Sequence, residues 1–191
     1  MGRWKGQRAR LWIAFGTAAL LTLAITVPAL AINSVTQVIT GGIMNAFVDD
    51  LVLASMSFSN TDHSNAGTLK LTANNSSGSA TSWSVTMQSS PFTYSGANAG
   101  TSIPAANFSI VSANAPTAAA GQAIDPTGGL KVPPTGATGA LNAARTVLKA
   151  DSGFRLGIYN QNLDVSLLIP ANSAPGSYSA ALNVTISPGS S

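Results

Sequence analysis

The chain has 191 residues, no cysteine and one histidine, with nine basic and six acidic side chains. This composition excludes a disulfide framework and a cysteine-based metal site. So few ionisable groups disfavour an enzyme, and the wealth of Ser, Thr, Asn, Ala and Gly favours an extracellular structural or adhesive domain.

The first 31 residues have the pattern of a secretory signal peptide. Residues 1–10 carry four basic side chains, and an uncharged apolar run extends from Leu11 to Val27. Ala29 and Ala31 then have the small-residue spacing of a signal-peptidase site. As a helix this run spans only about 25 Å, slightly less than a bilayer core, so a cleaved signal helix is favoured over an uncleaved anchor. We expect a mature chain that begins near Ile32.

The positive charge of the whole chain belongs to this leader. After residue 31, five Lys or Arg stand against six Asp, so the net charge there is −1, compared with +3 for the full chain. Binding to nucleic acid requires a basic patch on the folded domain. We therefore expect no nucleic-acid partner, and contact with a membrane only through the leader before cleavage.

Period-two alternation of apolar and polar side chains dominates the rest of the chain and predicts at least seven short strands. In the segment WSVTM, Trp83, Val85 and Met87 share one face. Trp83 could stack on a sugar ring from an exposed face, but its place in the apolar alternation favours the core. The predicted strands cover residues 34–39, 51–58 (with Val52, Ala54, Met56 and Phe58 on one face), 68–73, 83–87, 107–111, 154–158, 162–170 and 178–187.

The connecting segments are rich in turn-forming residues. Residues 113–139 are long and rich in Pro, Gly and Ala, which predicts a surface loop. Residues 139–151 fit either a helix, through the spacing of Leu141, Ala144 and Leu148, or a strand over TVLKA. Short strands with one apolar face indicate a closed barrel or, preferably, an antiparallel β-sandwich. We expect one all-β sandwich domain over residues 32–191.

The titratable side chains indicate no catalytic set. Asp49 and Asp50 are neighbours, which on a strand point to opposite faces, so a polar turn or strand entry is favoured over a shared-proton pair. His63 follows Asp62 in a serine-rich, turn-like segment, and without a GxSxG elbow a solvated histidine is favoured over a Ser-His-Asp triad. No EF-hand spacing supports calcium. We expect no catalytic residues, no metal and no cofactor.

Two segments carry a resemblance to a known family. The order AGTLKLTANNSSGSATSWSVTMQSSPFTY, then GIYNQNLDVSLLIPANSAPGSYSAALNVTIS, resembles the WxL-domain family of bacterial cell-surface proteins over about residues 45–187. Trp83 and Val85 match the first Trp-x-Leu-like motif, with valine in place of leucine. Val184 and Ile186 fall at the second motif, with valine in place of tryptophan. The approach to that second motif is matched by Pro170, Pro175, Gly176 and Tyr178.

The resemblance implies a secreted, non-enzymatic, all-β protein of the cell surface or cell wall. Its implied ligand is peptidoglycan or another wall polymer, bound noncovalently, with Trp83, Val85, Val184 and Ile186 as the binding positions. A weaker similarity, at residues 66–69 (AGTL), is to secreted fibre-forming proteins of biofilm matrices. The alternative function is a structural subunit of an extracellular filament or surface layer. Such a subunit would contact other surface proteins or its own copies through exposed strand edges or a donated strand such as Ser34–Ile39.

Overall fold

The computed structural model describes residues 37–79, 81–125, 127–154 and 156–189. The predicted signal helix and its cleavage site at Ala29 and Ala31 lie outside the described residues. The chain divides into two units, Met1–Val38 and Ile39–Ser191, and every strand found in the described residues belongs to the second. In the described part the strands pair antiparallel and no α-helix is present, which confirms the all-β prediction.

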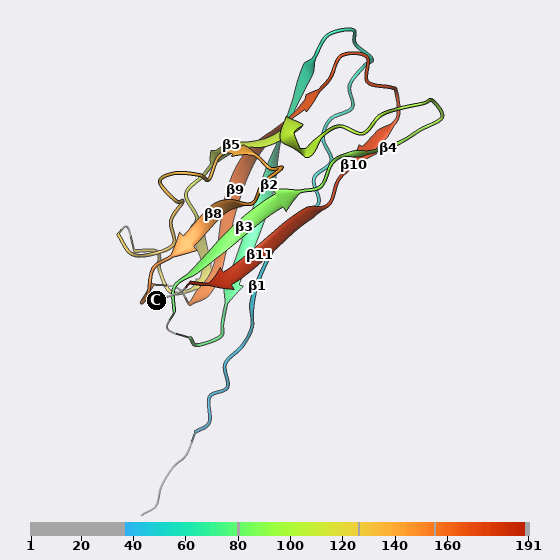
Figure 1. Cartoon of the computed structure of the whole chain (residues 1–191). Coiled ribbons are helices and arrows are strands. Elements are labelled where there is room, and N and C mark those ends of the chain that lie inside the picture. Colours follow the sequence, from blue (N-terminus) through green and yellow to red (C-terminus); the bar gives the residue numbers. More distant parts are fainter. Residues whose placement is uncertain (1–36, 80, 126, 155, 190–191) are drawn as a thin grey trace, which may run out of the picture. The chain divides into compact units, whose positions relative to one another are not determined.

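The larger sheet, which we call sheet A, has six strands in the order β1-β2-β9-β5-β7, with β6 also paired to β9 (Figure 1). Its two long central strands pair from His63 opposite Ile169 to Asn75 opposite Gly157. β5 and β6 follow one another along the other side of β9, and Pro116 lies in the break between them, where no ladder hydrogen bond is required of it. The bounds are β1 Met44–Val48, β2 His63–Asn75, β5 Phe108–Ala113, β6 Thr117–Gly121, β7 Gly139–Ala140 and β9 Gly157–Ile169. A short 3-10 turn, η1 (Ala105–Asn107), precedes β5.

The smaller sheet, sheet B, has the order β11-β3-β8, formed by Leu182–Pro188, Trp83–Ser89 and Arg145–Ala150. Its β3–β11 ladder is continued by a two-stranded ribbon of β4 (Thr93–Ser95) and β10 (Ser177–Ser179). Ser90 N donates to Ala181 O at 2.9 Å in the joint between the two ladders. In the ribbon, Tyr94 lies opposite Tyr178, with ring centroids 5.2 Å apart.

The inner faces of the two sheets meet in one core cluster, which explains the period-two pattern of the sequence. A strand that covers a core on one side buries alternate side chains. As predicted, most buried positions of β2, β3, β5 and β9 are the apolar members of each alternation; the polar exceptions are Asn75, Ser89 and Gln161. The cluster includes Leu69, Leu71, Ala73, Trp83, Val85, Met87, Phe108, Ile110, Val147, Leu148, Tyr159, Leu163, Val165 and Leu167.

Several predicted strands are wrong in position or extent. Leu51–Phe58 forms no strand; Leu51 and Leu53 pack against the core, while Val52 is 91% exposed. The described part of Ser34–Ile39 also forms no strand. The predicted strands at 154–158 and 162–170 are replaced by β9 alone, in which Ile158 lies on the outer face. The predicted strand at 178–187 is divided between β10 and β11.

The predicted surface loop at 113–139 is only partly a loop. It contains β6, which pairs with β9, and a turn region in which Leu130 and Ala137 are buried. For residues 139–151 the strand alternative is correct, because β7, a turn and β8 replace the helix. A bulge opposite Val85 and Thr86 leaves Val147 as an extra residue in β8, so that both Val147 and Leu148 are buried.

Candidate interaction surfaces

The four residues at the family-motif positions lie together in sheet B. Val85 is opposite Ile186 in the β3–β11 pairing, and Trp83 is two residues from Val85 on the same face. Trp83 is 1% exposed and Val85 is fully buried, while Val184 and Ile186 are half-buried against the same core cluster. The prediction that Trp83 is a core residue is confirmed. Trp83 and Val85 thus pack in the core and present no surface to a polymer outside the molecule, whereas Val184 and Ile186 are partly exposed.

The outward face of sheet A presents polar side chains over β2 and β9, most of them uncharged. These are the polar members of the alternation that buries the core: Thr68, Lys70 and Thr72 on β2, and Asn160 and Asn162 on β9. Register brings Thr72 opposite Asn160 and Lys70 opposite Asn162. We call this surface the outer polar face; its members are Phe47, Thr68, Lys70, Thr72, Asn160, Asn162 and Asp164.

Hydrogen bonds across the strands hold part of the outer polar face in place. Thr72 Oγ1 donates to Asn160 Oδ1 at 3.0 Å, and Thr68 Oγ1 donates to Asp164 Oδ1 at 2.9 Å. Asn162 is exposed between these two pairs. At one edge, Phe47 of β1 is opposite Thr72 and leaves 48% of its surface exposed. The face therefore combines ordered hydroxyl and amide groups with one apolar ring.

A groove of about 930 Å³ opens at the end of the core, beside the N-terminal half of β2. One side is residues 48–59, which follow β1, and the other is residues 173–182, which include β10. His63, Asn65 and Leu69 of β2 also line it. The residues that line the groove are mostly small polar or apolar ones. Such a groove suits an extended chain better than a charged small molecule.

The groups that might have formed a catalytic set are separated. His63 is the first residue of β2, not part of a loop, and its Nε2 lies 2.7 Å from Ser59 Oγ. Asp62 turns away from it, because its Oδ1 accepts a hydrogen bond from Ala171 N at 2.8 Å. Asp49 and Asp50 are exposed in the segment after β1, in agreement with a polar turn. Ser59 and His63 are thus in contact, but Asp62 is bonded to Ala171 and does not complete a Ser-His-Asp set with them.

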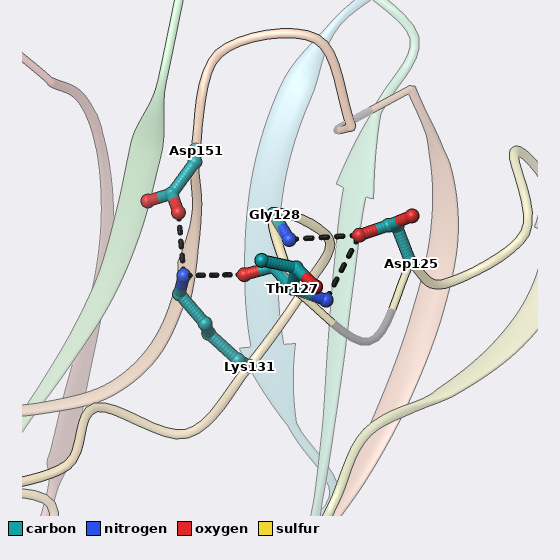
Figure 2. A network of polar contacts seen from close by, with 5 residues as sticks. All are labelled: Asp125, Thr127, Gly128, Lys131 and Asp151. Atoms are coloured by element: carbon teal, nitrogen blue, oxygen red, sulfur yellow. Dashed lines mark hydrogen bonds and ion pairs between the residues drawn. The ribbon is translucent and has the colours of Figure 1, made fainter.

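A polar network fixes the turn region between β6 and β7 (Figure 2). Asp125 Oδ1 accepts hydrogen bonds from Thr127 N and Gly128 N, both at 2.8 Å. Lys131 Nζ forms an ion pair with Asp151 and donates to Thr127 O. The two backbone N–H groups lower the pKa of Asp125, and the hydrogen bond and charge of Lys131 lower the pKa of Asp151. Sequence reasoning missed the Lys131–Asp151 pair because its partners are 20 residues apart.

These lowered pKa values predict acid sensitivity. A carboxylate with a lower pKa in the folded state stabilises the fold above its unfolded pKa, and this stabilisation is lost as the pH falls through the folded pKa. Thermal unfolding from neutral pH down to below the usual carboxyl range should therefore show a steeper loss of stability in the wild type than in Asp125→Asn/Asp151→Asn. Asp49→Asn/Asp50→Asn is the charge-matched control. Equal slopes in the wild type and the first double variant would contradict the assignment.

The described ranges contain no helix with the length and hydropathy that a membrane span requires. Within the same ranges, no three His, Asp or Glu side chains gather closely enough to hold a metal ion. Comparison with protein-family models, with curated proteins and with solved structures finds no match to this chain.

Proposed function

We propose that the protein is an exported, non-enzymatic cell-surface protein whose single domain associates noncovalently with a cell-wall polymer such as peptidoglycan. The export signal is the one expected from residues 1–31, and the ligand class is the one that the WxL-like motifs imply. The outer polar face of sheet A is the surface that binds. This surface differs from the family-motif positions, of which Trp83 and Val85 are buried and Val184 and Ile186 half-buried.

A β-sandwich architecture underlies this proposal. Sheet A and sheet B have separate strand orders with no strand in common, and their inner faces contribute to one core cluster. Two antiparallel sheets that share one core in this way support a sandwich over a closed barrel. In a sandwich the outward face of each sheet is available to a partner, since its side chains have no role in the core.

The observation that carries the proposal is the chemistry of the outer polar face. Wall glycans and their peptide stems present hydroxyl and amide groups, which both donate and accept hydrogen bonds. Asn160 and Asn162 can do the same through their side-chain amides, at the spacing that the pleat fixes. Thr72 and Asp164 orient their neighbours, and Phe47 offers an apolar ring to the less polar face of a sugar.

Sedimentation with purified peptidoglycan tests the proposal. The chain secreted by expressing cells should sediment with the wall polymer, and free wall fragments should release it. Asn160→Ala/Asn162→Ala removes two amides and should weaken binding by roughly tenfold or more. Asn142→Ala, in the exposed turn between β7 and β8, is the matched control and should bind as the wild type does. A wild-type protein that stays in the supernatant would refute wall association.

A further inference from the structure

Within the described part of the chain, the N-terminal half of β2 has no backbone partner along the edge that faces β1. In an antiparallel sheet the N–H and C=O groups of alternate residues point to the same neighbouring strand. Asp49 N donates to Lys70 O at 3.1 Å, so the even-numbered residues of β2 point to the side of β1. β1 itself pairs only as far as Val48 opposite Leu71. The N–H and C=O groups of Ser64, Ala66 and Thr68 therefore have no backbone partner among the described residues.

The groove lies against the same half of β2 and is bordered by exposed apolar side chains. His63, Asn65 and Leu69, which alternate with the open edge residues, line it. Met56 and Phe58 also line it, and they are 41% and 59% exposed. An open strand edge beside an apolar groove is the arrangement that accepts an added strand, with main-chain hydrogen bonds at the edge and side chains in the groove.

The chain also carries a segment suited to fill this place. Residues 34–40, SVTQVIT, are rich in β-branched side chains, which favour strands. In the described part of this segment no strand forms, and Val38 and Ile39 are 73% and 89% exposed. Immediately after it, Gly42 N donates to Ser76 O at 2.8 Å, and a Cβ atom on Gly41 would lie 2.3 Å from Ser77 O. The two glycines that directly follow the segment thus tie the chain to the end of β2.

We propose that residues 34–40 of one copy add as a strand to the Ser64–Thr68 edge of β2 in a second copy, with apolar side chains in the groove. The open stretch of β2, Ser64–Thr68, has five residues, and the donated segment has seven, so the segment is long enough to cover it. Because donor and acceptor are different surfaces, each copy that receives a strand still has its own to donate. Such a head-to-tail contact continues from copy to copy and builds a filament. This assembly goes beyond wall association and does not depend on it.

Complementary variants test the assembly in protein secreted from cells that express the full chain. The wild type should form multimers whose size grows with concentration. Val38→Asp/Ile39→Asp should prevent the segment from being added to another copy. Ala66→Pro should prevent the β2 edge from receiving a strand, because proline is tolerated in an edge strand but has no N–H for a hydrogen bond to the added strand. Each variant alone should form roughly tenfold fewer multimers than the wild type, or none. A mixture of the two should form dimers only, because one variant can accept but not donate a strand and the other can donate but not accept one. Val111→Asp, which places an aspartate on another exposed valine, is the surface control and should assemble normally.

Cysteine cross-linking tests the same contact without disturbing the strand. The natural chain has no cysteine, so each introduced thiol is unique. Ile39→Cys mixed with Ala66→Cys should form an intermolecular disulfide, and Ala118→Cys, on β6 at the opposite side of β9, is the matched control. A wild type that is monomeric at every concentration and salt, or equal cross-linking to Cys at 66 and 118, would overturn the proposal. Wall sedimentation of Val38→Asp/Ile39→Asp should be unchanged, which separates this result from wall binding.

Discussion

Replacement of Trp83 by alanine is expected to lower the free energy of unfolding by about 3–5 kcal/mol. The indole ring is 1% exposed and belongs to the core cluster that both sheets share. Its neighbours across the ladders are Ala150 and Pro188, whose side chains cannot fill the space that the ring would leave. The variant therefore loses both the burial of the ring and the contacts around it.

Chemical denaturation of the processed chain measures this effect. Ser84→Ala, on the opposite face of β3, is the control and should change stability by no more than about 0.5 kcal/mol. Trp4 and Trp12 are in the predicted leader, so Trp83 fluorescence reports alone after processing. It should be blue-shifted in the folded protein and shift to the red only on unfolding. A solvent-like spectrum before unfolding, or a stability loss below about 1 kcal/mol, would contradict a core role.

The sequence predicts those parts of the fold that depend on burial alone. A strand that covers a core must alternate, and the alternations at Leu69–Leu71–Ala73, Trp83–Val85–Met87 and Leu163–Val165–Leu167 give the inner faces of the central strands correctly. The all-β class follows from the number of such segments. Alternation does not reveal partners, so neither the strand order nor the fusion of two predicted strands into β9 could be predicted.

The wrong strand at Leu51–Phe58 has a physical cause. Met44, Ala46 and Val48 of β1 face the core, and regular continuation would bring Asp50 to the same face. Burial of an unpaired carboxylate is costly, so the chain leaves the strand after Val48. The phase then changes, and Leu51 and Leu53 pack inward where Val52, Ala54, Met56 and Phe58 were predicted to do so. The alternation within residues 51–58 alone does not show that a continued β1 would bury Asp50.

The sequence predicts which residues of the candidate surfaces are polar, but not which of them lie side by side. The polar positions of β2 and β9 are visible in the same alternation that gives the core, but the opposition of Thr72 and Asn160 depends on a register between residues 88 apart. The motif residues were predicted as neighbours in function, and the pairing of Val85 with Ile186 makes them neighbours in space. Trp83 and Val85 are buried and Val184 and Ile186 are half-buried against the same core cluster, which is a property of the whole fold that the motif alone does not contain.

Gln161 joins two irregular points of the fold, although it is a polar residue on the inner face of β9. Its side chain is 1% exposed. Nε2 donates to Val147 O at 3.1 Å and to Asn114 O at 3.0 Å. Val147 is the extra residue of the bulge in β8, and Asn114 lies in the break between β5 and β6. One amide group thus satisfies a carbonyl in each sheet where the regular ladder is interrupted.

Gln161→Ala is therefore expected to lower the free energy of unfolding by about 2–4 kcal/mol, because it leaves two acceptors without their donor and opens a cavity. Gln88→Ala is the matched control: its Nε2 also donates to a backbone carbonyl, that of Asn142, but the residue is exposed. Its loss should be at most about 1 kcal/mol. Equal losses in the two variants, measured by chemical denaturation, would show that Gln161 is not a bridge between the sheets.

Gln161→Glu separates the hydrogen bonds from the packing, because the two side chains have nearly the same shape. At neutral pH its buried carboxylate would face two carbonyl oxygens without a proton to donate, so the variant should be less stable than the wild type. Burial and these acceptors raise the pKa of such a carboxyl in the folded state. The difference from the wild type should therefore shrink as the pH falls through that raised pKa, since the protonated group regains one donor. A difference that is the same at neutral and acidic pH would mean that volume, not hydrogen bonding, is what this position requires.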